Sequence, residues 1–171
     1  MKLLVISDTH GRGSLIGQVL SLHPRYDMLL FLGDGLRDVD SNIGGVVAVR
    51  GNCDSFSLFG DSRSVATERM IDADGVKILM MHGHEKGVKS GIERAAAYSA
   101  ERGADVLAYG HTHIPEEKYY PAGTELCGKV LEKPLYVFNP GSLGEPRGAK
   151  PSFGVIEIKK GQILLSHGYL G

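Results

Sequence analysis

The stretch KLLVISDTHGR, residues 2–12, constrains the fold of this chain more than any other. Its apolar run from Leu3 to Ile6 has no polar alternation and therefore predicts a strand that is buried on both faces. We expect the chain to stay extended as it leaves this strand, so that Asp8 and His10, two residues apart, point the same way. A carboxylate and an imidazole on a rigid strand end suit a divalent metal ion. Taken alone, the stretch is explained equally well by a surface turn.

The following segments predict a right-handed parallel crossover. Apolar residues recur at helical spacing over 15–22, which indicates an amphipathic helix with Ser14 as its N-cap. A second continuous apolar run, 28–32, predicts another buried strand and ends just before Asp34. Because parallel strands all end on one side of a sheet, Asp34 is expected near Asp8.

The same pattern, an apolar run that ends in glycine and polar side chains, recurs along the rest of the chain. It predicts strands over 46–49, 106–109 and 135–138, a helix over 92–102, and hairpins of 65–72 with 76–81 and of 153–158 with 163–167. Residues 55–64 are predicted to form a loop that overhangs the strand ends, and 116–133 an irregular excursion.

Seven oxygen or nitrogen donors follow directly after these apolar runs. They are Asp8, His10, Asp34, Asn52, His82, His111 and His113. Of the 7 histidines, five lie in these turns. Histidines that served only in packing would be spread along the chain. A single tetrahedral zinc needs about four ligands, so this many donors without a thiolate cluster predict two metal ions that share a bridging carboxylate.

Length, composition and charge exclude several kinds of partner. With 171 residues and 42% hydrophobic content, we expect one domain that spans residues 1–171. The 19 basic and 20 acidic residues are intermixed, so no basic run is available for long nucleic acid. No stretch approaches the roughly 20 apolar residues of a membrane span. Two cysteines and the lack of a signal peptide indicate a cytoplasmic protein.

The motifs DTH, GD, GNCD, HGH and GHTH, in this order, resemble those of the calcineurin-like metallophosphoesterase superfamily. They extend from residue 8 to residue 113, and NPGS (139–142) and PRG (146–148) lengthen the match. The small size and the form GNCD are similar to the YfcE-like phosphodiesterases. The resemblance implies an α/β fold, a four-layer α/β/β/α sandwich of mixed sheets with flanking helices.

The resemblance also implies a ligand set and a reaction. One metal ion would be held by Asp8, His10 and His113, the other by Asn52, His82 and His111, with Asp34 as the bridge. Two divalent transition-metal ions are expected; the family favours manganese, while the ligand types also permit Ni, Zn, Fe or Co. The implied activity is hydrolysis of a small phosphodiester by attack of a metal-bridging hydroxide on phosphorus, without a phosphoenzyme.

The GNCD motif departs from the superfamily pattern at Cys53, where many members have a histidine. That imidazole would lie near the leaving group, and a general acid contributes roughly 100- to 10,000-fold. We therefore expect a preference for phosphodiesters over alkyl monoesters, the alternative being that Cys53 only packs in a turn. Asn52, Cys53 and Asp54 are the candidate catalytic residues, and Asp54 either orients a neighbour or caps a turn.

Arg12 and His84 are the candidate substrate-binding residues. The guanidinium of Arg12 can bind phosphate with two hydrogen bonds, and His84 lies either on the substrate or behind the metal ligands. Two other functions are open: a nucleotide or phosphomonoester phosphatase of the same superfamily, and a non-catalytic scaffold resembling the retromer subunit. The filled donor positions argue against the scaffold. Homo-oligomerisation and the physiological substrate are left open.

Overall fold

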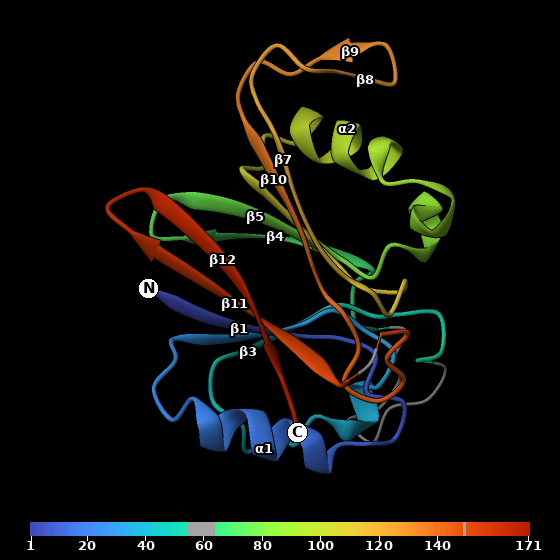
Figure 1. Cartoon of the computed structure of the whole chain (residues 1–171), viewed down its shortest axis with the longest axis vertical. Coiled ribbons are helices and arrows are strands. Elements are labelled where there is room, and N and C mark those ends of the chain that lie inside the picture. Colours follow the sequence, from blue (N-terminus) through green and yellow to red (C-terminus); the bar gives the residue numbers. More distant parts are fainter. Residues whose placement is uncertain (55–63, 149) are drawn as a thin grey trace.

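The computed structural model describes residues 1–54, 64–148 and 150–171, which form two five-stranded mixed sheets that face each other (Figure 1). In spatial order the first sheet contains β12 (Gln162–Tyr169), β11 (Ser152–Lys159), β1 (Lys2–Ile6), β2 (Met28–Phe31) and β3 (Val46–Ala48). The second contains β4 (Glu68–Ala73), β5 (Val76–Met81), β6 (Val106–Tyr109), β10 (Leu135–Pro140) and β7 (Pro115–Tyr120). The α/β class and the paired mixed sheets that we expected are confirmed.

The described residues also form two α-helices and three short 3-10 helices. Helix α1 (Ser14–Leu22) packs on the outer face of the first sheet, and α2 (Glu93–Glu101) packs on that of the second. The 3-10 helices are η1 (Leu36–Asp38), η3 (His84–Lys86) and η4 (Val88–Ser90). Among the described residues, no helix is long and apolar enough to cross a membrane.

Strand β1 is buried on both faces, as its continuous apolar run predicted. Leu3 and Val5 pack in the core between the two sheets, whereas Leu4 and Ile6 pack in the layer that contains α1. Strands β1, β2 and β3 are parallel, as are β5, β6 and β10 in the other sheet. Their carboxyl ends therefore supply the turns in which the candidate ligands lie.

Several predicted boundaries are corrected by the structure. Ser14 is the first residue of α1 and its side chain does not cap the helix, because Gly13 occupies the N-cap position. Leu22, at the end of the apolar stripe, is 60% exposed. Strand β10 continues through Asn139 and Pro140, because these residues pair with the start of β7. The predicted loop 55–64 lies, except for its last residue, outside the described residues.

The segment predicted as an irregular excursion contains regular strands. Its first part is β7, antiparallel to β10, and a small hairpin of β8 (Glu125–Leu126) and β9 (Lys129–Val130) follows. The Tyr119 ring packs on Tyr136, with ring centroids 4.9 Å apart. Because β7 runs away from the strand ends that carry the candidate ligands, Tyr119 lies apart from them.

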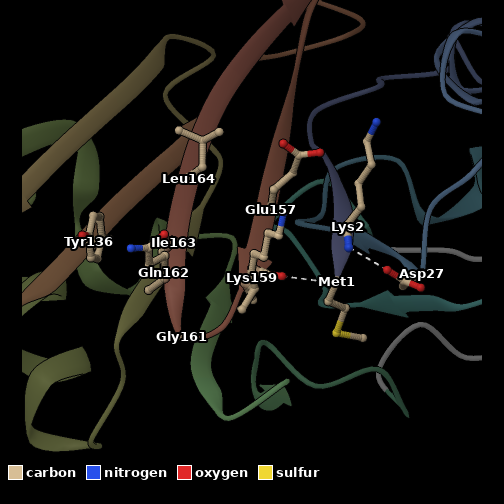
Figure 2. A pocket seen from close by; sticks show the side chains of 11 residues that line it. Met1, Lys2, Asp27, Tyr136, Glu157, Lys159, Gly161, Gln162, Ile163 and Leu164 are labelled. Atoms are coloured by element: carbon tan, nitrogen blue, oxygen red, sulfur yellow. Dashed lines mark hydrogen bonds between the residues drawn. The ribbon is translucent and has the colours of Figure 1, made fainter.

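An open pocket lies at the opposite edge of the first sheet, where β1 and β2 begin (Figure 2). The terminal amino group of Met1 donates to the carbonyl of Ile158 at its wall, and the backbone N–H of Lys2 donates to Asp27. None of the candidate site residues lines this pocket. The candidate site residues lie instead at the carboxyl ends of the strands.

The close contact of the two sheets generates a prediction about glycine. A Cβ on Gly154 of β11 would lie 2.3 Å from Cε1 of Phe138, so Gly154→Ala is expected to lower the free energy of unfolding by about 1–3 kcal/mol through overpacking. Around Gly17 of α1, no described atom lies within 4 Å of the added Cβ. Gly17→Ala should therefore raise the free energy of unfolding by about 0.5–1 kcal/mol. Denaturant unfolding measures both, and effects of equal sign would contradict this account.

Candidate metal centre

Five of the candidate ligands have left-handed backbone conformations, which side chains rarely adopt. Their φ angles are 55° at Asp8, 44° at His10, 56° at Asp34, 69° at His111 and 61° at His113. The prediction that the chain stays extended beyond β1 was therefore wrong, because it turns sharply instead. Each such residue costs of order 1–3 kcal/mol and persists only where the surroundings hold it, which is typical of functional sites.

The carboxylate of Asp8 presents one oxygen that is free to bind a cation. Its Oδ2 accepts hydrogen bonds from Ser7 Oγ at 2.5 Å and from the N–H of His111 at 3.0 Å. Its Oδ1 is buried and has no hydrogen-bond partner among the described residues. The nearest imidazole nitrogens are Nε2 of His113 at 3.1 Å and of His10 at 3.7 Å. An unpartnered buried carboxylate oxygen beside two imidazoles fits a divalent cation.

The carboxylate of Asp34 lies between two groups of histidines. Its Oδ2 is 3.2 Å from Nε2 of His82 and 3.9 Å from Nε2 of His10, while its Oδ1 accepts the N–H of Cys53 at 2.7 Å. The donor atoms of Asp8, His10 and His113 lie within 4.8 Å of one another, as do those of Asp34, His82 and His111. Six of the seven candidate metal ligands are thus brought together.

Backbone carbonyls orient two of the imidazoles. Nδ1 of His82 donates to the carbonyl of Leu32, and Nδ1 of His113 to that of Glu145, both at 2.7 Å. A carbonyl can only accept, so the neutral form of each ring carries its proton on Nδ1 and leaves the Nε2 lone pair facing the carboxylates. This is the usual arrangement behind a metal-binding histidine.

The carboxylates and imidazoles of the centre shift one another's pKa values. Burial alone would raise the pKa of Asp8, but His10 and His113 outweigh it and hold the pKa well below its usual range. Contact with Asp8 raises the pKa of His10, and Asp34 raises that of His82 against its burial. Burial lowers the pKa of His111 to about 4, so this ring is neutral near pH 7.

The residues of the GNCD segment differ in their position at the candidate metal centre. Asn52 is exposed, and its Nδ2 donates to Sγ of Cys53 at 3.2 Å. Cys53 Sγ lies within 4.8 Å of donor atoms of His10 and Asp34, and burial together with Asp34 raises the pKa of the thiol to about 11. Cys53 is therefore an uncharged thiol at the edge of the centre.

Asp54 is buried, and its carboxylate is occupied by backbone N–H groups. Oδ2 accepts from Asp34 and Gly51 and Oδ1 from Gly35 and Leu36, each at 2.8 Å. The sequence left two roles open for Asp54, the orientation of a neighbouring group or the capping of a turn, and four hydrogen bonds from backbone N–H groups favour the capping of a turn. Asp54 holds the loop that carries Asp34.

Arg12 and His84, the candidate substrate-binding residues, lie at the margin of the centre. Arg12 is exposed on the turn that follows His10. The His84 ring lies 5.5 Å from that of His82 and 6.1 Å from that of His111, and its Nδ1 is buried without a partner in the part of the chain described. His84 thus lies beside one histidine pair, outside the two donor groups.

Sequence reasoning missed residues that support the turns. Ser142 Oγ donates to the carbonyl of Asp8 at 2.8 Å, and the N–H of Gly144 donates to the same carbonyl at 2.9 Å. Asp38 accepts hydrogen bonds from both neighbours of His10. The NPGS motif was a signal for Ser142, but no pattern in the sequence singled out Asp38.

The match to a known family agrees with this centre. The model of the calcineurin-like phosphoesterase superfamily domain matches residues 1–161. The chain belongs to this superfamily. A probable metallophosphoesterase of Bacillus subtilis, YsnB, is 33% identical over 150 residues, which cover 86% of this chain and 78% of YsnB. The phosphodiesterase YfcE of Escherichia coli is 30% identical over 186 residues, covering 92% and 88%. The resemblance noted in the motifs is confirmed.

Solved structures share the fold of this superfamily member. A predicted phosphoesterase from Streptococcus pneumoniae superposes with a TM-score of 0.74 at 22% identity, covering 98% of this chain and 88% of the other. Vps29 from Entamoeba histolytica, solved with zinc, gives 0.65 at 23% identity over 99% of both chains. The YfcE structure gives 0.58 at 21% identity over 100% of both chains.

The imidazole pKa values predict how the metal-stripped protein responds to pH. The pKa values of His10 and His82 are raised above 6.5, so their contribution to stability is complete below pH 6.5 and is lost as pH rises through the raised values. The melting temperature in chelator should therefore fall from pH 6 to pH 8.5. Divalent metal should reverse this fall, because a cation replaces the lost protons beside the carboxylates.

Thermal unfolding with and without metal measures this effect. His23→Gln is the matched control, because burial lowers the pKa of His23 and its removal should leave the downward trend intact. A stripped protein whose melting temperature is constant or rises over this range would contradict the assignment.

Proposed function

We propose that this chain is a phosphodiesterase that works with two divalent transition-metal ions, foremost manganese. One ion would be held by Asp8, His10 and His113, and the other by Asn52, His82 and His111, while Asp34 would serve both. The observation that supports this most directly is the position of Asp34 Oδ2 between His82 and His10, near Oδ1 of Asp8, which accepts no hydrogen bond from any described residue. The superfamily match and the relative YfcE, named a phosphodiesterase, support the same reaction class.

When bound, such ions supply a water of lowered pKa and neutralise charge on the phosphoryl group. The protein's own residues prepare for this chemistry. Asp8 and Asp34 supply negative charge that offsets the cations, and His82 and His113 present fixed Nε2 lone pairs. The thiol of Cys53, with its pKa raised to about 11, is poorly suited to attack phosphorus itself. Direct hydrolysis without a covalent intermediate is therefore our proposal.

The proposed preference for phosphodiesters over phosphomonoesters rests on Cys53. It touches the loop of Asp34 and stands near His10, where a histidine would reach the leaving group. A protonated thiol is a weak donor, so the leaving oxygen receives little help from this position. Substrates with good leaving groups are favoured, and alkyl phosphomonoesters are disfavoured.

The remaining candidate site residues have supporting roles in the proposed reaction. Asn52 supplies a neutral amide oxygen at the exposed end of the centre, and Arg12 meets the phosphate from the solvent side. His84 contacts the substrate beside His111 or supports that ligand. Asp54 acts through the Asp34 loop and does not touch the substrate. The mixed surface charge fits a small phosphoester better than long nucleic acid.

The likeness in fold to Vps29 leaves a second candidate open, a non-catalytic protein scaffold. That Vps29 was solved with zinc, so metal binding alone does not distinguish a scaffold from an enzyme. Hydrolysis of a phosphoester distinguishes the enzyme from the scaffold. A nucleotide or monoester phosphatase would differ in which ester reacts faster.

Metal restoration tests the proposed activity. The metal-stripped protein should hydrolyse bis(4-nitrophenyl) phosphate when Mn is restored, and should hydrolyse 4-nitrophenyl phosphate more slowly, with Ni, Zn and Mg compared singly. Asp34→Asn should lower kcat/KM by at least about 100-fold, since it weakens the site of both ions. His23→Gln, away from the centre, should not. Two bound metals without turnover of either ester would overturn the enzyme assignment and favour a scaffold.

The role of position 53 has its own test. Cys53→His should raise kcat/KM for the monoester by about 100-fold, the lower end of a general acid's contribution, and should affect the diester less. Cys127→His makes the same change at an exposed residue of the β8–β9 turn and serves as control. If monoester hydrolysis does not rise, Cys53 only packs in its turn.

A further inference from the structure

His10 differs from the other candidate ligands in how its ring is held. Nδ1 of His82 and of His113 are each tied to a backbone carbonyl. In the ranges that the structure describes, Nδ1 of His10 has no hydrogen-bond partner, and its Nε2 faces the centre, 3.7 Å from Asp8. That Nε2 also lies 3.4 Å from Nε2 of His113, but no carbonyl fixes the ring from its Nδ1 side, so the backbone of His10, which has a φ of 44°, helps to set the position of the ring.

The residues on both sides of His10 are held by one carboxylate. Oδ2 of Asp38 accepts a hydrogen bond from Thr9 Oγ1 at 2.5 Å and another from the N–H of Gly11 at 2.8 Å. The Asp38 side chain is 8% exposed and Thr9 is fully buried. Bonds to a charged acceptor shielded from water are stronger than neutral ones.

The chain is shaped to admit this contact. A Cβ on Gly35 would lie 1.9 Å from Thr9 Oγ1 and 2.9 Å from Oδ2 of Asp38, so only glycine leaves room for the pair. The N–H of Asp38 donates to the carbonyl of Gly35 at 2.8 Å, while the N–H of Gly35 is held by Asp54. Helix η1 therefore ties the turn of His10 to the loop that carries Asp34.

We propose that Asp38 is the positioning residue for His10. Its carboxylate holds the strained turn from both sides, so that Nε2 of His10 reaches the metal ion of Asp8 and His113. The other ion would be held through His82 and His111, whose turns make no hydrogen bond to this carboxylate within residues 1–54, 64–148 and 150–171. This inference rests on the proposed two-metal function.

Calorimetric titration of the metal-stripped protein with Mn tests the inference. The wild type should bind two ions. Asp38→Ala should bind one ion as the wild type does and the other about 10- to 100-fold more weakly. Asp38→Asn keeps an oxygen acceptor for both donors, so its weaker affinity should lie closer to the wild type than to Asp38→Ala.

Two further variants make the test specific. Thr9→Val removes one donor while keeping the side-chain shape, so it should weaken the same ion, and its effect should shrink when Asp38 is already alanine. Asp40→Ala removes an exposed carboxylate that accepts only from Asn42 among the described residues, and should leave both affinities unchanged. Thr9→Val also keeps the test informative if Asp38→Ala does not fold.

Three results would overturn the inference. Wild-type affinities for both ions in Asp38→Ala and Thr9→Val would remove the role of Asp38 and leave the two-metal proposal intact. Equal weakening of both ions, with a lower melting temperature, would show general support of the fold in place of positioning. Fewer than two ions in the wild type would overturn the proposed function, and this inference with it.

Discussion

Two carboxylates, Asp8 and Asp34, are buried at one edge of the sandwich, and their negative charge has to be balanced there. In the metal-free chain the imidazoles of His10 and His82 do this, which is why their pKa values rise while those of the carboxyls fall. Divalent cations do the same with neutral imidazoles as ligands. The geometry of the edge follows from this requirement, because each ring has to reach a carboxylate.

The side chains that balance the charge of the two carboxylates are positioned by strained turns. Left-handed conformations at five candidate ligands aim their side chains inward, and the surrounding chain holds them. Asp54 collects four backbone N–H groups around the Asp34 loop, and Ser142 and Gly144 hold the carbonyl of Asp8. Because rigid, fully buried strands precede these turns, the supporting hydrogen bonds meet a fixed frame. A preorganised site of this kind binds ions without reordering the chain.

The fold by itself does not decide the activity. Phosphoesterases and Vps29 share this architecture, so the distinction lies in the donor set and its neighbours. In this chain six donors from distant turns converge, and the position beside Asp34 carries a thiol in place of an imidazole. The first feature supports the proposed hydrolysis of phosphoesters, and the second is the basis of the proposed preference for diesters over monoesters.

The sequence by itself determined most of the strands outside residues 116–133, the parallel arrangement of β1 and β2, and the gathering of carboxylates and imidazoles at one edge. These follow from local patterns: an uninterrupted apolar run is buried on both faces, and parallel strands end together. The extended exit from β1, the capping role of Ser14 and the function of Asp54 could not be judged in this way. Only the tertiary structure decided them, because the groups that bend and hold these turns, such as Asp38 for Thr9, lie 29 residues apart in the sequence. Hydrogen bonds between such distant residues leave no periodic pattern to read.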